Sequence, residues 1–214
     1  MNLSKPLSSL MPTLEAEVLT VLAGANASFT GRQVHALVGA SSESGIRRAL
    51  QRLSIQGIVT CKRAGASDLY ELNPDHLMAR YIKSIVNLRS ELFETIADAI
   101  SKWAVAPICG AIFGSAVRSD MQPESDIDIF IVRPDLVKPG MDSWEEQGAA
   151  LTKKVSQWTG NDVQIFELSE SQVEVSVEKK DEVLLEIINE AIIFFGPDEY
   201  LRTLRFKNGD RTHG

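Results

Sequence analysis

The chain has 214 residues, of which 44% are hydrophobic and 24% charged, and its formal net charge is −7. These values fit a folded protein of one or two domains. No run approaches the roughly 20 apolar residues of a membrane span, and the N-terminus does not read as a signal peptide. Cys61 and Cys109 have neither zinc-site nor disulfide-framework spacing. The sequence therefore predicts a cytoplasmic protein with reduced thiols and no membrane partner.

The first 75 residues predict three helices followed by a hairpin. Residues 12–22 carry apolar side chains at helical spacing, and Thr30 is a candidate N-cap for a short helix over 31–38. A third helix begins at a Ser41 or Ser42 cap and ends near Gly57. Two strand-like runs, 58–63 and 68–72, are separated by a small-residue turn and indicate a hairpin.

The third helix has one apolar and one basic face. Its apolar side chains recur at i, i+3, i+4 and i+7, and these are Ile46, Ala49, Leu50 and Leu53. Within residues 30–70, six basic side chains stand against two acidic ones, although residues 76–214 are strongly acidic. The order helix–helix–helix–hairpin resembles a winged helix-turn-helix, in which the third helix enters the DNA major groove. That resemblance implies DNA contacts from Arg47, Arg48, Gln51 and Arg52 on the helix, and from Lys62 and Arg63 on the wing. The alternative is a dimerisation or protein-docking module.

Residues 76–103 predict one long connecting helix, or two abutting ones, because apolar residues recur there at steps of three and four without Gly or Pro. Its stripe would pair within the chain or with a twin in a homodimer. Strands are expected at 108–113, 126–132, 162–166 and 192–196, and helices at 144–158 and 179–192. The expected fold class is α+β, with these parts: 1–75 winged helix-turn-helix, 76–103 connecting helix, 104–200 α/β domain with a small mixed sheet, and 201–214 polar tail.

The most informative stretch joins the first two strands of the C-terminal part. The first strand ends at Gly114-Ser115, and the second carries Asp126 and Asp128. Because strand side chains alternate between faces, these two carboxylates point to the same side. Such a pair suits Mg²⁺, which typically takes one or two carboxylates together with substrate phosphates. Gly114 allows close backbone approach to a phosphate, and Ser115 and Arg118 offer hydrogen-bond donors to it. Taken alone, Asp-x-Asp more often belongs to a β-hairpin with a solvated acidic edge.

The full string resembles the signature G-S-x-x-R-x(n)-S-D-x-D-[hydrophobic] of the DNA polymerase β-like nucleotidyltransferases, particularly the minimal group. The matching residues are Gly114, Ser115, Arg118, Ser125, Asp126 and Asp128. The resemblance implies that an NTP is bound with Mg²⁺ or Mn²⁺ through Gly114, Ser115, Arg118 and Ser125. It also implies that Asp126 and Asp128 hold the metal.

A third carboxylate is the point at which this sequence departs from the family pattern. The resemblance implies an acid on the strand after the long helix, but alignment puts Gln164 at that position. A glutamine brings no charge and cannot act as a base. Asp162 lies two residues earlier on the same strand face and is the substitute candidate, although it is equally suited to closing the turn.

Two main hypotheses follow for function, and a scaffold that has lost both activities is a third. In the first, the chain is a Mg²⁺-dependent enzyme that transfers a nucleoside monophosphate from an NTP to an unknown hydroxyl acceptor, tethered to a DNA-binding module. In the second, it is a winged-helix transcriptional regulator whose nucleotidyltransferase-like domain binds a nucleotide but is catalytically weak. The arginine-faced helix and Gln164 favour the second, and the Gly-Ser and Asp-x-Asp elements favour the first.

Overall fold

The structure, a computed structural model, describes residues 1–39, 41–118 and 120–209. It consists of two compact units, and the division along the chain falls between Arg89 and Ser90. Each unit has its own sheet. Among the helices in the described part of the chain, none has the length and apolar character to cross a bilayer.

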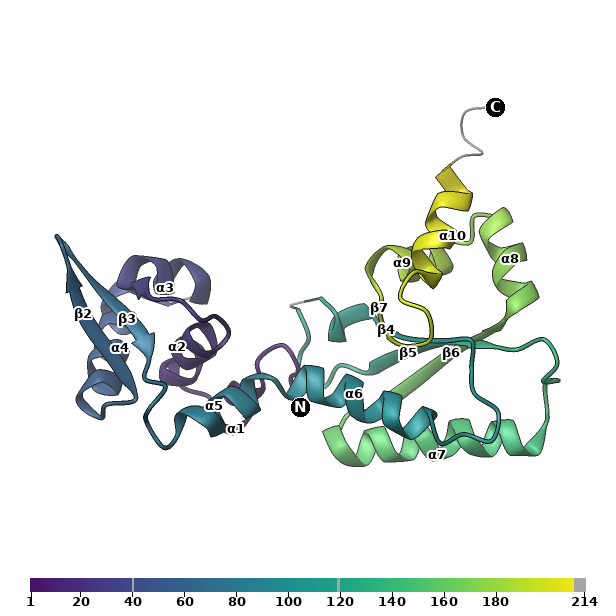
Figure 1. The fold of residues 1–214 in the computed structure, drawn as a ribbon, viewed down its shortest axis with the longest axis horizontal. Helices are drawn as coiled ribbons and strands as arrows, with labels where there is room; N and C mark the ends of the chain where they lie inside the picture. Colours follow the sequence, from purple (N-terminus) through teal and green to yellow (C-terminus); the bar gives the residue numbers. More distant parts are fainter. Residues whose placement is uncertain (40, 119, 210–214) are drawn as a thin grey trace. The chain divides into compact units, whose positions relative to one another are not determined.

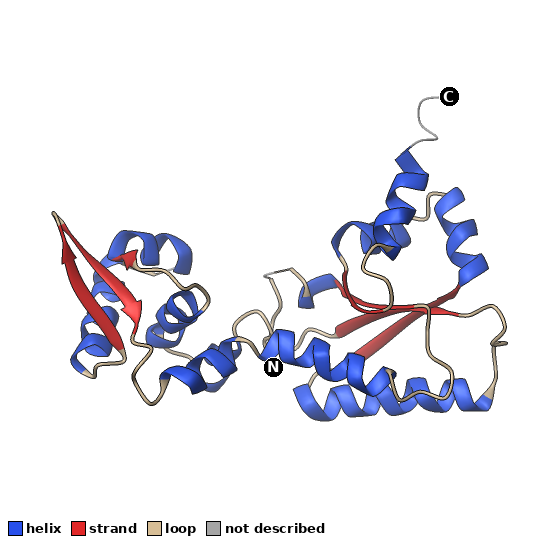
Figure 2. Cartoon of the chain, in the orientation of Figure 1, coloured by secondary structure: helices blue, strands red, loops and turns tan. Residues whose placement is uncertain are grey.

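The N-terminal unit combines five helices with a three-stranded antiparallel sheet of order β1-β3-β2 (Figure 2). The helices are α1 (Pro6–Leu10), α2 (Leu14–Ala23), α3 (Gly31–Val38), α4 (Glu43–Ile55) and α5 (Ala79–Val86). The strands are β1 (Phe29–Thr30), β2 (Val59–Ala64) and β3 (Ser67–Leu72). The three expected helices and the hairpin are confirmed. Helix α1 and strand β1 were not expected, since five and two residues are too few to show a period.

Local capping explains where α3 and α4 begin. The Thr30 side chain accepts a hydrogen bond from the Gln33 amide, and the Gln33 side chain accepts one from the Thr30 amide, which forms a capping box. The Ser42 hydroxyl accepts from the Gly45 amide and caps α4. The apolar face expected on α4 is buried in the core of this unit, as Ile46, Ala49, Leu50 and Leu53.

The connecting segment is two helices, so the expectation of a single long helix was wrong and the abutting pair is correct. Helix α5 ends at Val86, the backbone leaves helical geometry at the C-cap residue Asn87, and α6 (Leu88–Ile100) begins directly after it. No Gly or Pro marks this break. Asn competes with helical backbone for hydrogen bonds and has a low helix propensity, but its effect is too weak to be read from periodicity alone.

The C-terminal unit is built on a four-stranded mixed sheet of order β6-β5-β4-β7. Its strands are β4 (Cys109–Phe113), β5 (Ile127–Arg133), β6 (Val163–Ser169) and β7 (Ile192–Phe195). Its further helices are α7 (Asp142–Thr159), α8 (Glu170–Glu178), α9 (Glu182–Glu190) and α10 (Tyr200–Gly209). Strands β5 and β6 are parallel and connected through α7, whereas β4 is antiparallel to both β5 and β7. The expected α+β class with a small mixed sheet is confirmed.

Helices cover both faces of this sheet. Figure 1 shows α6 and α7 on one face and α8, α9 and α10 on the other. The second face carries the aliphatic and aromatic core that includes Phe130 and Val132, which are fully buried. Helices α8 and α10 were not expected. The tail expected over 201–214 is therefore helical up to residue 209, and residues 210–214 lie outside the described part.

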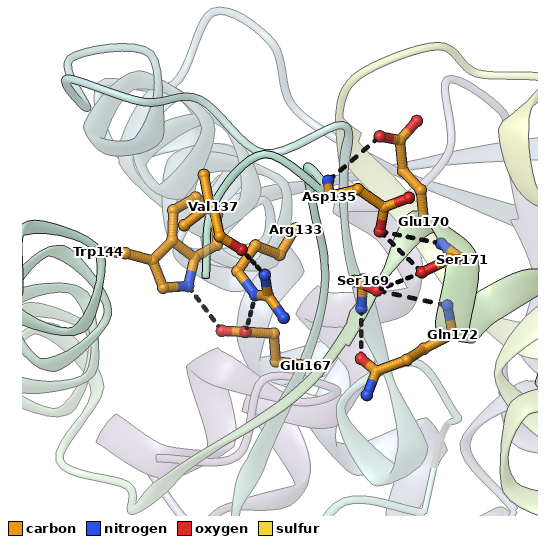
Figure 3. Close-up of polar contacts among 9 residues, drawn as sticks. All are labelled: Arg133, Asp135, Val137, Trp144, Glu167, Ser169, Glu170, Ser171 and Gln172. Carbon is orange, nitrogen blue, oxygen red and sulfur yellow. Dashed lines mark hydrogen bonds and ion pairs between the residues drawn. The ribbon is translucent and has the colours of Figure 1, made fainter. Parts of the chain in front are cut away.

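Around the C-terminal ends of β5 and β6, two polar clusters tie the neighbouring loops to the sheet (Figure 3). In the first, the buried Arg133 donates to Glu167 Oε1 at 2.6 Å and to the Val137 carbonyl, and Trp144 Nε1 donates to Glu167 Oε2 at 2.8 Å. In the second, Asp135 Oδ1 accepts hydrogen bonds from the Ser171 amide and hydroxyl at the start of α8. These hydrogen bonds hold the pKa of Asp135 below its usual range.

Glu167→Ala is expected to lower the free energy of unfolding by about 3 kcal/mol, because it removes the charge partner of a guanidinium that is only 6% exposed. The change in the free energy of unfolding is measured by urea denaturation at neutral pH. The control is Glu146→Ala, an exposed acid of α7, for which a change within about 0.5 kcal/mol is expected. Equal effects of the two substitutions would contradict a stabilising role for Glu167.

Candidate active site and nucleic-acid interface

The Gly-Ser turn lies directly against one of the two aspartates. Strand β4 ends at Phe113, which pairs with Asp128 on β5, and Gly114 begins a short 3₁₀ turn with a φ of +70°. A Cβ atom built on Gly114 would stand 2.5 Å from Asp128 Oδ2. The position is therefore restricted to glycine both by its left-handed backbone and by the adjacent carboxylate.

The two aspartates lie close together at the start of β5, near enough for the charge of Asp126 to act on Asp128. Asp128 is half-buried on β5, and Asp126 is exposed one residue before the strand. Burial raises the pKa of Asp128, and the negative charge of Asp126 raises it further. The positive charge of Arg118 lowers the pKa of Asp128, whereas the negative charge of Glu190 raises it. Ionised Asp128 is thus held in an environment that disfavours its charge, which a cation would relieve.

Strand β6 brings Gln164 beside Asp128. The parallel register pairs Asp128 with Gln164 and Ile127 with Val163. Paired residues of neighbouring strands point to the same face, so Gln164 lies on the face of Asp128, at the position for which the family resemblance implies an acid. Asp162 precedes the strand, its side chain is exposed, and its carbonyl accepts the Ile127 amide at 2.8 Å. The structure therefore brings Asp162, Gln164, Asp126 and Asp128 to one end of the β5–β6 pair.

Arg118 is surrounded by carboxylates. Its Nη1 donates to Glu190 Oε2 at 2.7 Å and to Glu186 Oε1 at 3.2 Å, and its Nε lies 3.7 Å from Asp120 Oδ2. Hydrogen bonding to Glu190 is the main cause of its raised pKa. Glu190 also accepts the Gly114 amide at 2.7 Å through Oε1. Glu186 and Glu190 were not expected from the sequence, since they lie about seventy residues farther along the chain.

Ser125 has a local role in the loop before β5. Its hydroxyl accepts the Gln122 amide at 3.0 Å, and its own amide donates to the Gln122 carbonyl at 3.1 Å. The buried Asn161 donates to the carbonyls of Pro123 and Ser125, at 3.1 and 2.9 Å. Asn161 was not expected as a site residue from the sequence. The structure shows that it holds the loop that leads into Asp126.

The residues present fit a divalent cation bound together with a nucleotide. No three Asp, Glu, His or Cys side chains gather as a ready-made metal cluster within residues 1–39, 41–118 and 120–209. Mg²⁺ commonly takes only one or two protein carboxylates and completes its shell with phosphates and water. Asp126 and Asp128 supply such a pair, and the carbonyl of Gln164 is a further neutral oxygen.

The basic residues expected to meet DNA lie on the exposed surface of the N-terminal unit. Arg47, Arg48, Gln51 and Arg52 are all exposed along α4, and Lys62 and Arg63 are exposed on β2. Two of them already have acidic partners: Arg52 pairs with Glu15, and Arg63 donates to Asp68 at 3.0 Å. Their charge is thereby partly compensated, which leaves Arg47, Arg48 and Lys62 as the stronger candidates.

A groove of about 620 Å³ lies between α4 and the hairpin of this unit. Arg32 and Arg47 line it together with Tyr70, and Glu43 and Asp68 contribute acids. The groove is polar and carries charges of both signs. It therefore suits a contact with a polar backbone better than it suits an apolar ligand.

Residues 94–199 match the family model described as polymerase beta, nucleotidyltransferase. The C-terminal unit is thus similar to nucleotidyltransferase domains of the polymerase β type, in agreement with the resemblance of its Gly-Ser and Asp-x-Asp elements. The match begins within α6 and ends just before α10.

Part of the chain also resembles a solved structure described as "Crystal structure of the toxin-antitoxin with AMP-PNP". The similarity has a TM-score of 0.40 and 15% sequence identity, and it covers 56% of this chain and 86% of the other. No curated protein matches the chain.

Proposed function

We propose that the C-terminal unit transfers a nucleoside monophosphate from an NTP, bound with Mg²⁺ or Mn²⁺, to a hydroxyl acceptor. The observation that carries this proposal is the contact between the Gly114 turn and Asp128, with the charge of Asp126 acting on Asp128 from just before the strand. A phosphate approaching the turn would meet backbone donors and a metal-binding carboxylate at once. That is the requirement for binding a metal–triphosphate complex.

Each residue has a proposed role in this site. Asp126 and Asp128 would hold the metal, whose positive charge would offset the charge on the phosphates. Ser115 would bind phosphate oxygens beside Gly114, whose lack of a side chain lets a phosphate approach and whose own amide donates to Glu190. Ser125 would complete the phosphate-binding loop. Arg118, whose side chain is 44% exposed, would counter the phosphate charge from the far end of the turn. Asp162 is the candidate for the base that removes the acceptor proton.

A label-transfer assay tests this proposal directly. The full chain is incubated with Mg²⁺ or Mn²⁺ and with each of the four NTPs labelled at the α-phosphate, and labelled protein, RNA and small molecules are separated afterwards. Transfer of the α-phosphate label, with release of pyrophosphate, is the expected result. Absence of transfer with every NTP, in a preparation that binds nucleotide, would leave only the binding part of the proposal.

The N-terminal unit is proposed to be a winged helix-turn-helix that binds DNA. Three observations support it: the order of α2, β1, α3, α4, β2 and β3, the antiparallel sheet β1-β3-β2, and the exposed arginines of α4. Helix α4 would then enter the major groove, and the β2–β3 hairpin would contact the backbone. An electrophoretic mobility shift with the DNA upstream of the protein's own coding sequence tests this at low salt.

Arg47→Ala combined with Arg48→Ala is expected to weaken DNA binding and to flatten its salt dependence, by about one log–log unit for each phosphate that is no longer neutralised. Both side chains are exposed on α4. The matched control is Lys153→Ala with Lys154→Ala, which removes two exposed charges from α7 in the other unit. Equal salt slopes for the two double variants would contradict an interface on α4.

A second candidate function is a transcriptional regulator whose nucleotidyltransferase domain senses a nucleotide without efficient transfer. The specific observation in its favour is Gln164 beside Asp128, because an amide can neither bring a third negative charge nor accept a proton. Nucleotide-dependent change in DNA affinity, without transfer of label, is the result that would favour this candidate.

A further inference from the structure

The carboxylate of Glu190 bridges the two ends of the Gly-Ser turn. Its Oε1 accepts the Gly114 amide at 2.7 Å, and its Oε2 accepts Arg118 Nη1 at 2.7 Å. The turn is also closed internally, because the Gly114 carbonyl accepts the amides of Val117 and Arg118 at 3.0 and 3.1 Å. One side chain therefore fixes both the first residue of the turn and the guanidinium one helical turn later.

Two regular elements hold Glu190 in this place. It is the last residue of α9, and β7 begins two residues later and pairs with β4 through Ile192 and Ile112. Strand β4 leads directly into Gly114, so the β4–β7 pairing brings the end of α9 to the turn. Glu190 is only 19% exposed, whereas Glu186, the other α9 partner of Arg118, is 62% exposed.

We propose that Glu190 is a positioning residue of the nucleotide site, which acts through Gly114 and Arg118; this rests on the nucleotide binding proposed above. Charge-assisted hydrogen bonds are the stronger kind, and a carboxylate that accepts two of them has a defined orientation. Glu190 thereby sets where the turn's backbone donors and the Arg118 guanidinium meet a phosphate. A site that relies on backbone donors needs such a supporting residue, because small displacements of donors cost affinity.

Titration calorimetry of the full chain with Mg-ATP and Mg-GTP provides the binding test. Glu190→Ala is expected to weaken nucleotide binding about ten-fold or more, the range for loss of a hydrogen bond with a charged group. Glu190→Gln keeps an acceptor for the Gly114 amide but loses the charge opposite Arg118, so an intermediate loss is expected. The control Glu186→Gln removes an exposed partner of the same Arg118, and a change within about three-fold is expected.

A double-mutant cycle tests whether Glu190 acts through Arg118. In the Arg118→Ala background, Glu190→Gln should weaken binding less than about two-fold further, because the group that it orients is already absent. A second readout, independent of nucleotide, is amide hydrogen exchange at Gly114, which should become faster in Glu190→Ala and stay unchanged in Glu186→Gln.

These outcomes separate the inference from the proposed function. Wild-type protein that binds neither nucleotide would overturn the proposed function, while Gly114 exchange would still report on the contact. Wild-type binding with unchanged affinity in Glu190→Ala, or tighter binding in Glu190→Gln, would overturn the positioning role and leave nucleotide binding standing. If Glu190→Ala fails to fold, the isosteric Glu190→Gln carries the test.

Discussion

Asp128→Asn should abolish divalent-dependent nucleotide binding while leaving the fold intact. The affinity for Mg-NTP should fall by more than the roughly 10–100-fold that loss of an outer-shell metal partner costs, because Asp128 is a proposed ligand itself. The change is isosteric, so Gly114 keeps its close neighbour. Calorimetric titration with Mg-NTP measures the effect, and Asp126→Asn should act in the same direction.

Thermal stability is a second readout for Asp128→Asn, and it should stay the same or rise although nucleotide binding is lost. Burial and Asp126 raise the pKa of Asp128 above its usual value, so the ionised carboxylate is less favourable in the folded chain than in the unfolded one. That penalty is present at pH values above the unfolded pKa. Removing the charge should therefore leave the melting temperature at pH 7 unchanged or raise it. A drop in both stability and binding would indicate a folding defect instead.

A matched control tests whether the loss of binding depends on which carboxylate is removed. Glu124→Gln removes one exposed carboxylate two residues before Asp126, outside the strand face that carries the pair. Its Mg-NTP affinity should equal that of the wild type. Equal affinities in the wild type, Asp126→Asn and Asp128→Asn would show that the metal assignment is wrong.

The parts of the fold that could be predicted are those with a local signal. The alternation Ile127-Asp128-Ile129 appears in the structure as buried isoleucines on either side of a half-buried acid, and the capping residue Thr30 marks the start of α3. Helix α8, which was not expected, has a local signal of the same kind. Ser169 and Gln172 form a capping box there, so Ser-x-x-Gln after a strand is enough to locate its start.

The parts that could not be predicted depend on contacts between distant residues. Glu190 reaches Gly114 only because β7 pairs with β4, and a single sequence contains no sign of that pairing. Similarly, Arg118 matches the family motif, but its three acidic neighbours come from the tertiary structure and the adjacent loop. Sequence patterns indicated the proposed donors and ligands of the site, whereas the residues that contact and orient them became apparent only in the structure.

Gln164→Asp should raise nucleotidyl transfer by about 10²–10⁴-fold if the natural chain lacks a base, since that is the usual contribution of a positioned general base. The side chain at 164 stands beside Asp128 in the parallel register, so an aspartate there would restore the family's third carboxylate. Label transfer from α-labelled NTP under saturating Mg²⁺ measures the rate. The control Gln157→Asp adds the same charge on the exposed surface of α7 and should leave the rate unchanged.

Asp162→Ala decides which residue supplies the base in the natural chain. If Asp162 performs this role, its loss should lower the rate by the same factor of about 10²–10⁴ with little change in nucleotide affinity, and Gln164→Asp should then restore the rate in the double variant. If Asp162→Ala has no effect and Gln164→Asp creates transfer that the wild type lacks, the natural protein is a nucleotide binder, and the regulator becomes the better-supported function. If neither change alters anything and no NTP supports transfer, the catalytic proposal fails despite the Gly-Ser turn and the paired aspartates.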